Sequence, residues 1–288
     1  MDSTELLKKV RAIEIKTRGL SSHIFSGEYH SAFKGRGMAF SEVREYVPGD
    51  EIKNIDWNVT ARMGHPYVKV FEEERELTVM VLVDVSGSGN FGTRKQTKRS
   101  LITELTATLA FSAIENNDKT GVIFFSDKVE KYIPPKKGRT HILRIVRELI
   151  DFKPSGKGTD LNAVLEFLNG VQKKRCICFL LSDFECTPFE TALRVAAKRH
   201  DMVPIRIYDH AEEQLPTKGN FLFSDAESGE QMWIHINRRT RAKFKEERAK
   251  LNEKLKGVFN RCGLDYTQIA TDQDYVRPLS TLFKRRVR

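Results

Sequence analysis

The feature that most constrains the fold is the segment of residues 77–88, LTVMVLVDVSGS. Its apolar run, residues 79–83, is far shorter than the roughly 20 apolar residues of a membrane-spanning helix. A short apolar run bounded by turn residues is typical of a strand buried on both faces of a parallel sheet. The segment therefore predicts an α/β protein with this strand near the centre of its sheet.

Three oxygen-bearing side chains follow this strand at every second position: Asp84, Ser86 and Ser88. In an extended or gently turning segment, side chains with this spacing point the same way. Open α/β sheets bind their ligands just beyond the carboxyl ends of the strands. One carboxylate and two hydroxyls at that position suit a hard divalent cation such as Mg²⁺.

A second segment supplies further oxygen ligands. Residues 175–181 form another apolar run, which ends in Ser182 and Asp183. Between the two strands lies the glycine-containing loop of residues 154–160, PSGKGTD, which leads directly into a predicted helix. Thr159 stands where that helix begins, so its hydroxyl is free to face the same strand ends.

Each of these residues also has a purely structural interpretation. Asp84 and Asp183 could cap helices or form turns, and the two serines could be ordinary loop residues beside glycines. Thr159 could be only a helix N-cap. Because all five follow the carboxyl ends of predicted strands or open a helix beside them, a shared metal site is the favoured interpretation.

The five positions resemble the metal-ion-dependent adhesion site of von Willebrand factor A (vWA) domains. The pattern Asp84-x-Ser86-x-Ser88, a later Thr159 and then Asp183 after a strand fills every position of that motif. The resemblance implies that the hydroxyls touch Mg²⁺ or Mn²⁺ and that the two aspartates act largely through bound water. It also implies that a partner's Asp or Glu carboxylate completes the coordination, and no catalytic residue is expected.

The region before the first strand is also specific. The patterns GRGxxF, RxYxPGD, IDWxxxAR and VKxFExE follow one another between residues 35 and 74. They resemble the N-terminal flank of the DUF58 family of bacterial proteins, and the resemblance extends from about residue 35 to the end. It implies a flank of residues 1–76 packed on the core, then a vWA-like domain of residues 77–288 with an insertion around 210–237. It further implies an adaptor that works with a MoxR-type AAA+ ATPase in assembling or maturing protein complexes.

Charged residues of the flank could form a paired network around Trp57: Arg44, Asp50, Asp56, Arg62, Lys69 and Glu73. Such a network would either seal one edge of the sheet or provide a docking surface for a partner. The first alternative is favoured because no chemistry stands out in the flank.

The remaining segments alternate between strand and helix patterns. Helices are expected over the first eighteen or so residues and over 96–116, 139–151, 160–171, 188–200, 238–261 and 274–287. Strands are expected at 67–71, 120–125, 129–133, 202–208 and 266–270, with a hairpin of 221–223 and 232–236 in the insertion. This order predicts a doubly wound, mostly parallel sheet whose 129–133 strand is an antiparallel edge, together with an N-terminal helix and a short β-rich flank.

The net charge of +10 makes nucleic acid a second candidate partner. Ten of the basic residues lie within 238–261, above an apolar stripe formed by Phe244, Leu251, Leu255, Val258, Phe259 and Cys262. A packed helix with a solvated basic face is the favoured interpretation, because aromatic residues do not alternate with the basic ones. The alternative is a ribonucleoprotein or nucleic-acid-binding protein that uses this helix.

Other functional classes are less compatible with the sequence. An aspartyl phosphatase needs a second Asp where Ser86 stands, and neither GxxxxGK[ST] nor GxSxG occurs. The four cysteines, Cys176, Cys178, Cys186 and Cys262, show no zinc-finger spacing and are expected to be reduced thiols. With neither an apolar span nor a signal-peptide core, a cytoplasmic location is expected.

Overall fold

The computed structural model describes residues 8, 10–14, 17, 38–73, 77–224 and 229–286. Two compact units emerge, one of residues 34–77 and the other of residues 1–33 with 78–288. The start of the sheet-containing unit at Thr78 lies close to the predicted division after residue 76. That the flank packs on the core stays a prediction.

The larger unit is built on a six-stranded sheet with the order β10-β7-β6-β3-β4-β5. Its strands are β3 (Thr78–Asp84), β4 (Lys119–Phe125), β5 (Val129–Lys136), β6 (Ile177–Ser182), β7 (Asp201–Tyr208) and β10 (Thr267–Ala270). All neighbouring pairs are parallel except β4 and β5. The predicted mostly parallel sheet with an antiparallel edge is therefore confirmed.

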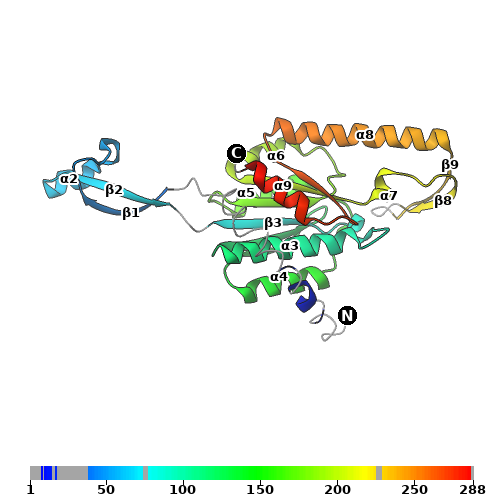
Figure 1. Cartoon of the computed structure of the whole chain (residues 1–288), viewed down its shortest axis with the longest axis horizontal. Coiled ribbons are helices and arrows are strands. Elements are labelled where there is room, and N and C mark those ends of the chain that lie inside the picture. Colours follow the sequence, from blue (N-terminus) through cyan, green and yellow to red (C-terminus); the bar gives the residue numbers. More distant parts are fainter. Residues whose placement is uncertain are drawn as a thin grey trace. The chain divides into compact units, whose positions relative to one another are not determined.

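Helices cover both faces of this sheet (Figure 1). One face packs against α5 (Leu161–Val171), α6 (Glu190–Arg199) and the end of α8 (Arg238–Arg261). On the opposite face lie α3 (Lys98–Glu115), α4 (Arg139–Asp151) and α9 (Val276–Arg286). The architecture is a three-layer, doubly wound α/β fold, as the alternation of segments predicted.

The apolar run of β3 explains why this strand is central. Residues 79–83 are at most 1% exposed, and both neighbours pair with them in register: Val81 lies between Val122 of β4 and Phe179 of β6. Alternate side chains meet different helical layers, so Met80 and Leu82 contact the α5 and α6 side. A strand covered on both faces has no position for a polar side chain until Asp84, where the sheet ends.

The insertion after β7 contains α7 (His210–Glu213) and the predicted hairpin, formed by β8 (Gly219–Ser224) and β9 (Gln231–Ile236). The apolar stripe of α8 differs from the expectation. Val258 and Phe259 are buried, but Leu251 is 53% exposed. Only the last turns of this helix lie over the sheet (Figure 1). Near its start Phe244 is half-buried and lines a hollow with Leu215 of the insertion, so Leu251 is the stripe residue left exposed between the two contacts.

The smaller unit contains β1 (Met38–Glu45), the 3₁₀ turn η1 (Ile52–Asn54), α2 (Trp57–Met63) and β2 (Tyr67–Glu73). The two strands form an antiparallel ladder, and neither β1 nor α2 was expected from the sequence. Of the proposed charge network, Arg44 binds Asp50 and Lys69 lies 3.4 Å from Asp56. Four of the six expected residues thus pair, as two separate ion pairs, but Trp57 is 67% exposed and is not enclosed by them. The side chain of Glu73 lies outside the described residues.

Other sequence expectations concern the N-terminal helix, the thiols and membrane spans. Residues 8, 10–14 and 17 are helical, and Val10 packs with α3 and α4. All four cysteines are free thiols, and Cys176 and Cys178 are buried. Within the described ranges, every helix is too short or too polar to cross a membrane.

Candidate metal centre

Two adjacent strands end at the candidate site. Parallel β3 and β6 are hydrogen-bonded neighbours, so their carboxyl ends reach the same edge of the sheet. Asp84 is the last residue of β3, and Asp183 follows β6 directly. Both side chains are nearly enclosed, at 5% and 7% exposure. Two carboxylates from segments far apart in sequence are thereby buried together.

The turn after β3 directs two hydroxyls at these carboxylates. The short 3₁₀ turn η2 (Gly87–Asn90) begins after Ser86, whose backbone N donates to Asp84 Oδ1 at 3.0 Å. The Oγ atoms of Ser86 and Ser88 lie 3.1 Å apart. Ser88 Oγ donates to Asp183 Oδ2 at 2.8 Å, which joins the β3 turn to β6.

Thr159 reaches the cluster from the loop before α5. Its Oγ1 lies 3.5 Å from Asp84 Oδ2, at the long limit of a hydrogen bond. The N-cap of α5 is Asp160, whose carboxylate accepts from the backbone N of Asn162 and of Ala163. The N-cap alternative for Thr159 is therefore wrong, and its hydroxyl remains available to the site.

The loop that carries Thr159 is held from two sides. Gly87 N donates to the carbonyl of Lys157 at 3.0 Å, which ties the loop to the serine turn. Glu130 of β5 accepts from the backbone N and the hydroxyl of Ser155, from Gly156 N and from the Ser126 hydroxyl. Burial opposes ionisation of Glu130, but these donors outweigh it and lower its pKa.

Two residues that sequence reasoning did not assign to the site take part in the cluster. Ser182, noted only as the end of its strand, donates to Asp84 Oδ2 at 2.6 Å and accepts from Phe184 N at 3.0 Å. Lys98, in the first turn of α3, is 2% exposed. Its Nζ donates to Asp183 Oδ2 at 2.8 Å and to Glu212 Oε1 of α7 at 2.6 Å. No pattern around Lys98 in the sequence distinguishes it from a solvated lysine.

The two aspartates differ in their electrostatics. Burial, together with the negative charge of Asp183, raises the pKa of Asp84 to about 6. Burial also opposes ionisation of Asp183, but the Lys98 ammonium outweighs it and the pKa of Asp183 is lowered. The centre therefore contains one carboxylate that is matched by a lysine and one that has only hydrogen-bond donors. Asp84 is the group that a cation would stabilise most.

The donor set fits a hard cation. Oxygen atoms of two carboxylates and of three hydroxyls converge here, which is the ligand chemistry of Mg²⁺ and Mn²⁺. A cavity of about 10 Å³, close to the size of one water molecule, is lined by Asp84, Ser88, Lys98 and Asp183. Within the described residues, no group of three or more His, Cys, Asp or Glu is placed to hold a metal, so hydroxyls would have to serve as ligands.

The five residues predicted from the sequence thus form one connected cluster, and that they hold a metal stays a prediction. The model of the family described as "Protein of unknown function DUF58" matches residues 42–254. The chain belongs to the DUF58 family.

This DUF58 protein is 28% identical over 280 residues to Uncharacterized protein Rv1480 of Mycobacterium tuberculosis, with coverage of 96% of this chain and 88% of the relative. Among solved structures it is similar to BatB from Bacteroides thetaiotaomicron, with 15% identity, a TM-score of 0.48 and coverage of 73% and 98% of the two chains. It is also similar to the mussel byssus protein PTMP1 "with zinc occupied MIDAS motif", with 16% identity, a TM-score of 0.40 and coverage of 74% and 47%. The fold assignment rests on the strand order and the helical layers described above.

Proposed function

We propose that this DUF58 protein is a metal-dependent protein-interaction module in which a divalent cation, Mg²⁺ or Mn²⁺, binds at Asp84, Ser86, Ser88, Thr159 and Asp183. The observation that carries the proposal is the convergence of two buried carboxylates and three hydroxyls at the ends of β3 and β6. In this role the bound cation would accept an Asp or Glu carboxylate from a protein partner. The chain would then act by binding, without catalysis.

The charge balance of the site supports a carboxylate as the incoming group. Serine and threonine hydroxyls are neutral, so they would leave the charge of a cation less compensated than a set of carboxylates would. The positive charge of Lys98 beside Asp183 is offset by Glu212, so it does not compensate for the neutral hydroxyls. Without the cation, Asp84 and Asp183 would repel an acidic side chain of the partner.

A single ion contact is too weak for a stable complex, because unit charges about 4 Å apart contribute on the order of 1–4 kcal/mol in water or near a protein surface. Additional surface is present on the insertion that follows the carboxyl end of β7. The hairpin exposes Leu222, Met232 and Trp233, at 47%, 65% and 69%. Its preceding helix α7 is joined to the centre through the Lys98–Glu212 contact. We assign this hairpin to the partner interface, because Leu222 and Trp233 are cross-strand partners and form an exposed apolar pair on one of its faces, a feature that marks interaction sites.

The partner that the family resemblance suggests is a MoxR-type AAA+ ATPase. The test is affinity capture with the full chain as bait, performed in Mg²⁺, in EDTA, and with the variant Ser86→Ala/Ser88→Ala. The expected result is an AAA+ ATPase that is retained by the unaltered chain in Mg²⁺ and is lost in the other two conditions. Purified ATPase should then bind with the same metal dependence in calorimetric titration.

The matched control is Ser100→Ala/Thr140→Ala, which removes two exposed hydroxyls outside both the site and the hairpin and should retain the partner. Equal capture in Mg²⁺ and EDTA would refute a metal-mediated interface. Capture of RNA that is released by raised salt would instead support the nucleic-acid alternative, because phosphate contacts are strongly salt-dependent.

A further inference from the structure

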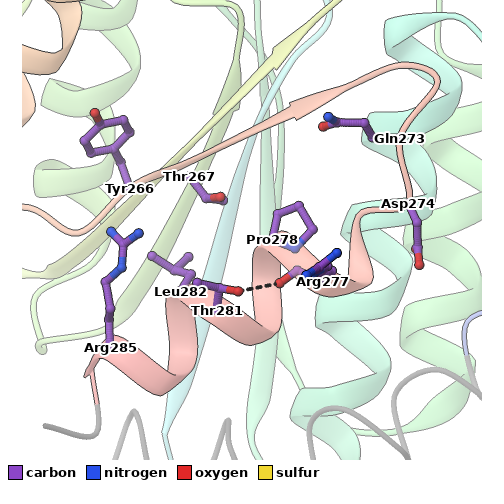
Figure 2. Close-up of a pocket in the computed structure, with 9 residues that line it drawn as sticks. All are labelled: Tyr266, Thr267, Gln273, Asp274, Arg277, Pro278, Thr281, Leu282 and Arg285. Carbon is purple, nitrogen blue, oxygen red and sulfur yellow. Dashed lines mark hydrogen bonds between the residues drawn. The ribbon is translucent and has the colours of Figure 1, made fainter.

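A second concave surface lies away from the candidate metal centre, beside the outer strand β10. It has a volume of about 560 Å³ and lies between β10 and α9 (Figure 2). Tyr266 and Thr267 contribute from the strand side, Leu282 and Arg285 from the helix, and Gln273 from the connecting turn.

The backbone of β10 has an outer edge without a partner strand. Among the described strands β10 pairs only with β7, and Thr271 N donates to Tyr208 O of that neighbour. Since backbone groups alternate in direction along a strand, those of Gln268 and Ala270 face outward. The Gln273 side chain already accepts from Ala270 N at 3.3 Å, and Gln273 N donates to Ala270 O. The backbone N–H and C=O of Ala270 are thus both hydrogen-bonded to Gln273. The backbone N–H and C=O of Gln268 remain available to pair with an added strand.

Two arginines give this surface a positive charge. Arg277 and Arg285 both line the pocket from α9 and are exposed. Within the described part of the chain neither guanidinium forms an ion pair, whereas the adjacent Arg286 binds Asp201 and Asp265. The pocket also contains one carboxylate, Asp274, which accepts from Val276 N at the start of α9. Two unpaired arginines beside an open strand edge favour a peptide that carries carboxylates.

We infer that the groove between β10 and α9 binds an extended acidic peptide, which adds to the outer edge of β10 and pairs its carboxylates with Arg277 and Arg285. Backbone pairing at a sheet edge would supply affinity, and the two guanidinium groups would supply selectivity. Eight helical residues separate the arginines, which is about 12 Å along the axis. Four residues of a strand span about 13 Å, so acidic residues four positions apart match this spacing.

The test is a selection of random peptides of about ten residues, displayed on phage, against the full chain in EDTA. Enriched sequences are expected to carry two Asp or Glu four positions apart among β-branched residues. The best peptide, synthesised with a fluorophore, should bind at least about ten-fold more weakly to Arg277→Glu/Arg285→Glu. The same peptide with alternate backbone nitrogens methylated should lose binding, because it keeps its carboxylates but cannot form the ladder.

Two controls isolate the groove. Arg147→Glu/Lys254→Glu makes the same change in net charge at exposed positions on α4 and α8 and should bind the peptide normally. Asp84→Asn should also bind normally, so this result is separate from the metal proposal. The inference is overturned if enriched peptides lack carboxylates, if no peptide is enriched, or if the charge reversal leaves affinity unchanged. Full binding of the methylated peptide would show that no strand is added to β10. Equal competition by a thymidine oligonucleotide would show that the groove binds anions in general. Either result would also overturn the inference.

Discussion

Lys98 Nζ lies 2.8 Å from Asp183 Oδ2, and both side chains are almost entirely buried. The centre therefore already holds one positive charge, contributed by the chain itself. The same Asp183 oxygen also accepts from Ser88 Oγ. A bound cation would consequently share the Asp183 carboxylate with Lys98 and Ser88. The stronger the contact between Lys98 and Asp183, the less of the negative charge of Asp183 is available to a metal.

Replacing Lys98 with Met is expected to have opposite effects on the free and the metal-bound protein. In EDTA the variant should be less stable by about 3–5 kcal/mol, because Asp183 and Glu212 lose their buried partner. Saturating Mg²⁺ should then raise its melting temperature more than that of the unaltered chain, since the cation replaces the lost charge. Thermal unfolding with and without Mg²⁺ measures both effects.

Lys95→Met, at an exposed position in the loop that precedes α3, is the control and should change neither quantity. If Mg²⁺ raises the melting temperature of Lys98→Met and of the unaltered chain by the same amount, the lysine and the metal do not compete.

Asp84→Asn is expected to remove binding of Mg²⁺ and Mn²⁺ while the fold is retained. The amide keeps the shape of the side chain, so its Oδ1 can still accept from Ser86 N, while its Nδ2 would donate to Ser182 Oγ instead of accepting from it. It removes the carboxylate that has no cationic partner within the cluster. Isothermal titration should show no divalent binding, and urea unfolding in EDTA should show no loss of stability. Unchanged metal affinity in this variant would contradict the site.

Glu130→Ala is expected to weaken metal binding from a distance. Glu130 holds the backbone of Ser155 and Gly156 and thereby the loop that carries Thr159. Supporting residues of metal ligands typically change affinity by about 10–100-fold when removed. Titration calorimetry should show a loss within that range. Glu166→Ala, at an exposed position on α5, should leave the affinity unchanged, and an unaltered affinity in Glu130→Ala would show that the loop is held by other contacts.

The sheet and the five-residue cluster could be predicted because buried parallel strands, and the polar residues that follow them, leave a distinctive pattern in the sequence. A strand such as β3, buried on both faces, has to be apolar throughout, and its first polar residues mark the edge where ligands bind. In a parallel sheet the ends of β3 and β6 have to meet at the same edge. The order of segments therefore determined which carboxylates would approach one another.

Lys98 and Trp57 could not be placed in this way. A lysine in the first turn of a helix is usually solvated, and only the position of α7 brings Glu212 to it. Trp57 was expected to lie within a network of paired charges, yet α2 leaves it 67% exposed. Thr159 could not be distinguished from an N-cap because Asp160, the next residue, is an equally good cap. In each case the outcome depends on tertiary contacts that local sequence does not encode.

Asp209 offers a test of the fold at a point outside the centre. This buried residue directly follows β7, caps α7 and accepts from the Thr93 and Thr271 side chains, so it joins three segments. Burial opposes its ionisation, but the Thr271 and Thr93 donors outweigh burial and lower the pKa of Asp209 to about 2. The folded state therefore binds this proton more weakly than the unfolded state does.

The sign of the pH dependence follows from that difference. The stabilisation is fully present above the ordinary pKa of 3.8 and is lost as the pH falls through about 2. A shift of this size corresponds to about 2 kcal/mol, so Asp209→Asn should lower the free energy of unfolding by about that amount at neutral pH. Denaturant titrations measure the difference in free energy of unfolding between the unaltered chain and Asp209→Asn. This difference should fall to about half near pH 3, where the carboxyl group of the unfolded chain is largely protonated. Asp151→Asn, at an exposed position, is the control and should have the same free energy of unfolding as the unaltered chain. If the difference for Asp209→Asn stays constant with pH, the Asp209 carboxyl does not ionise more readily in the folded state.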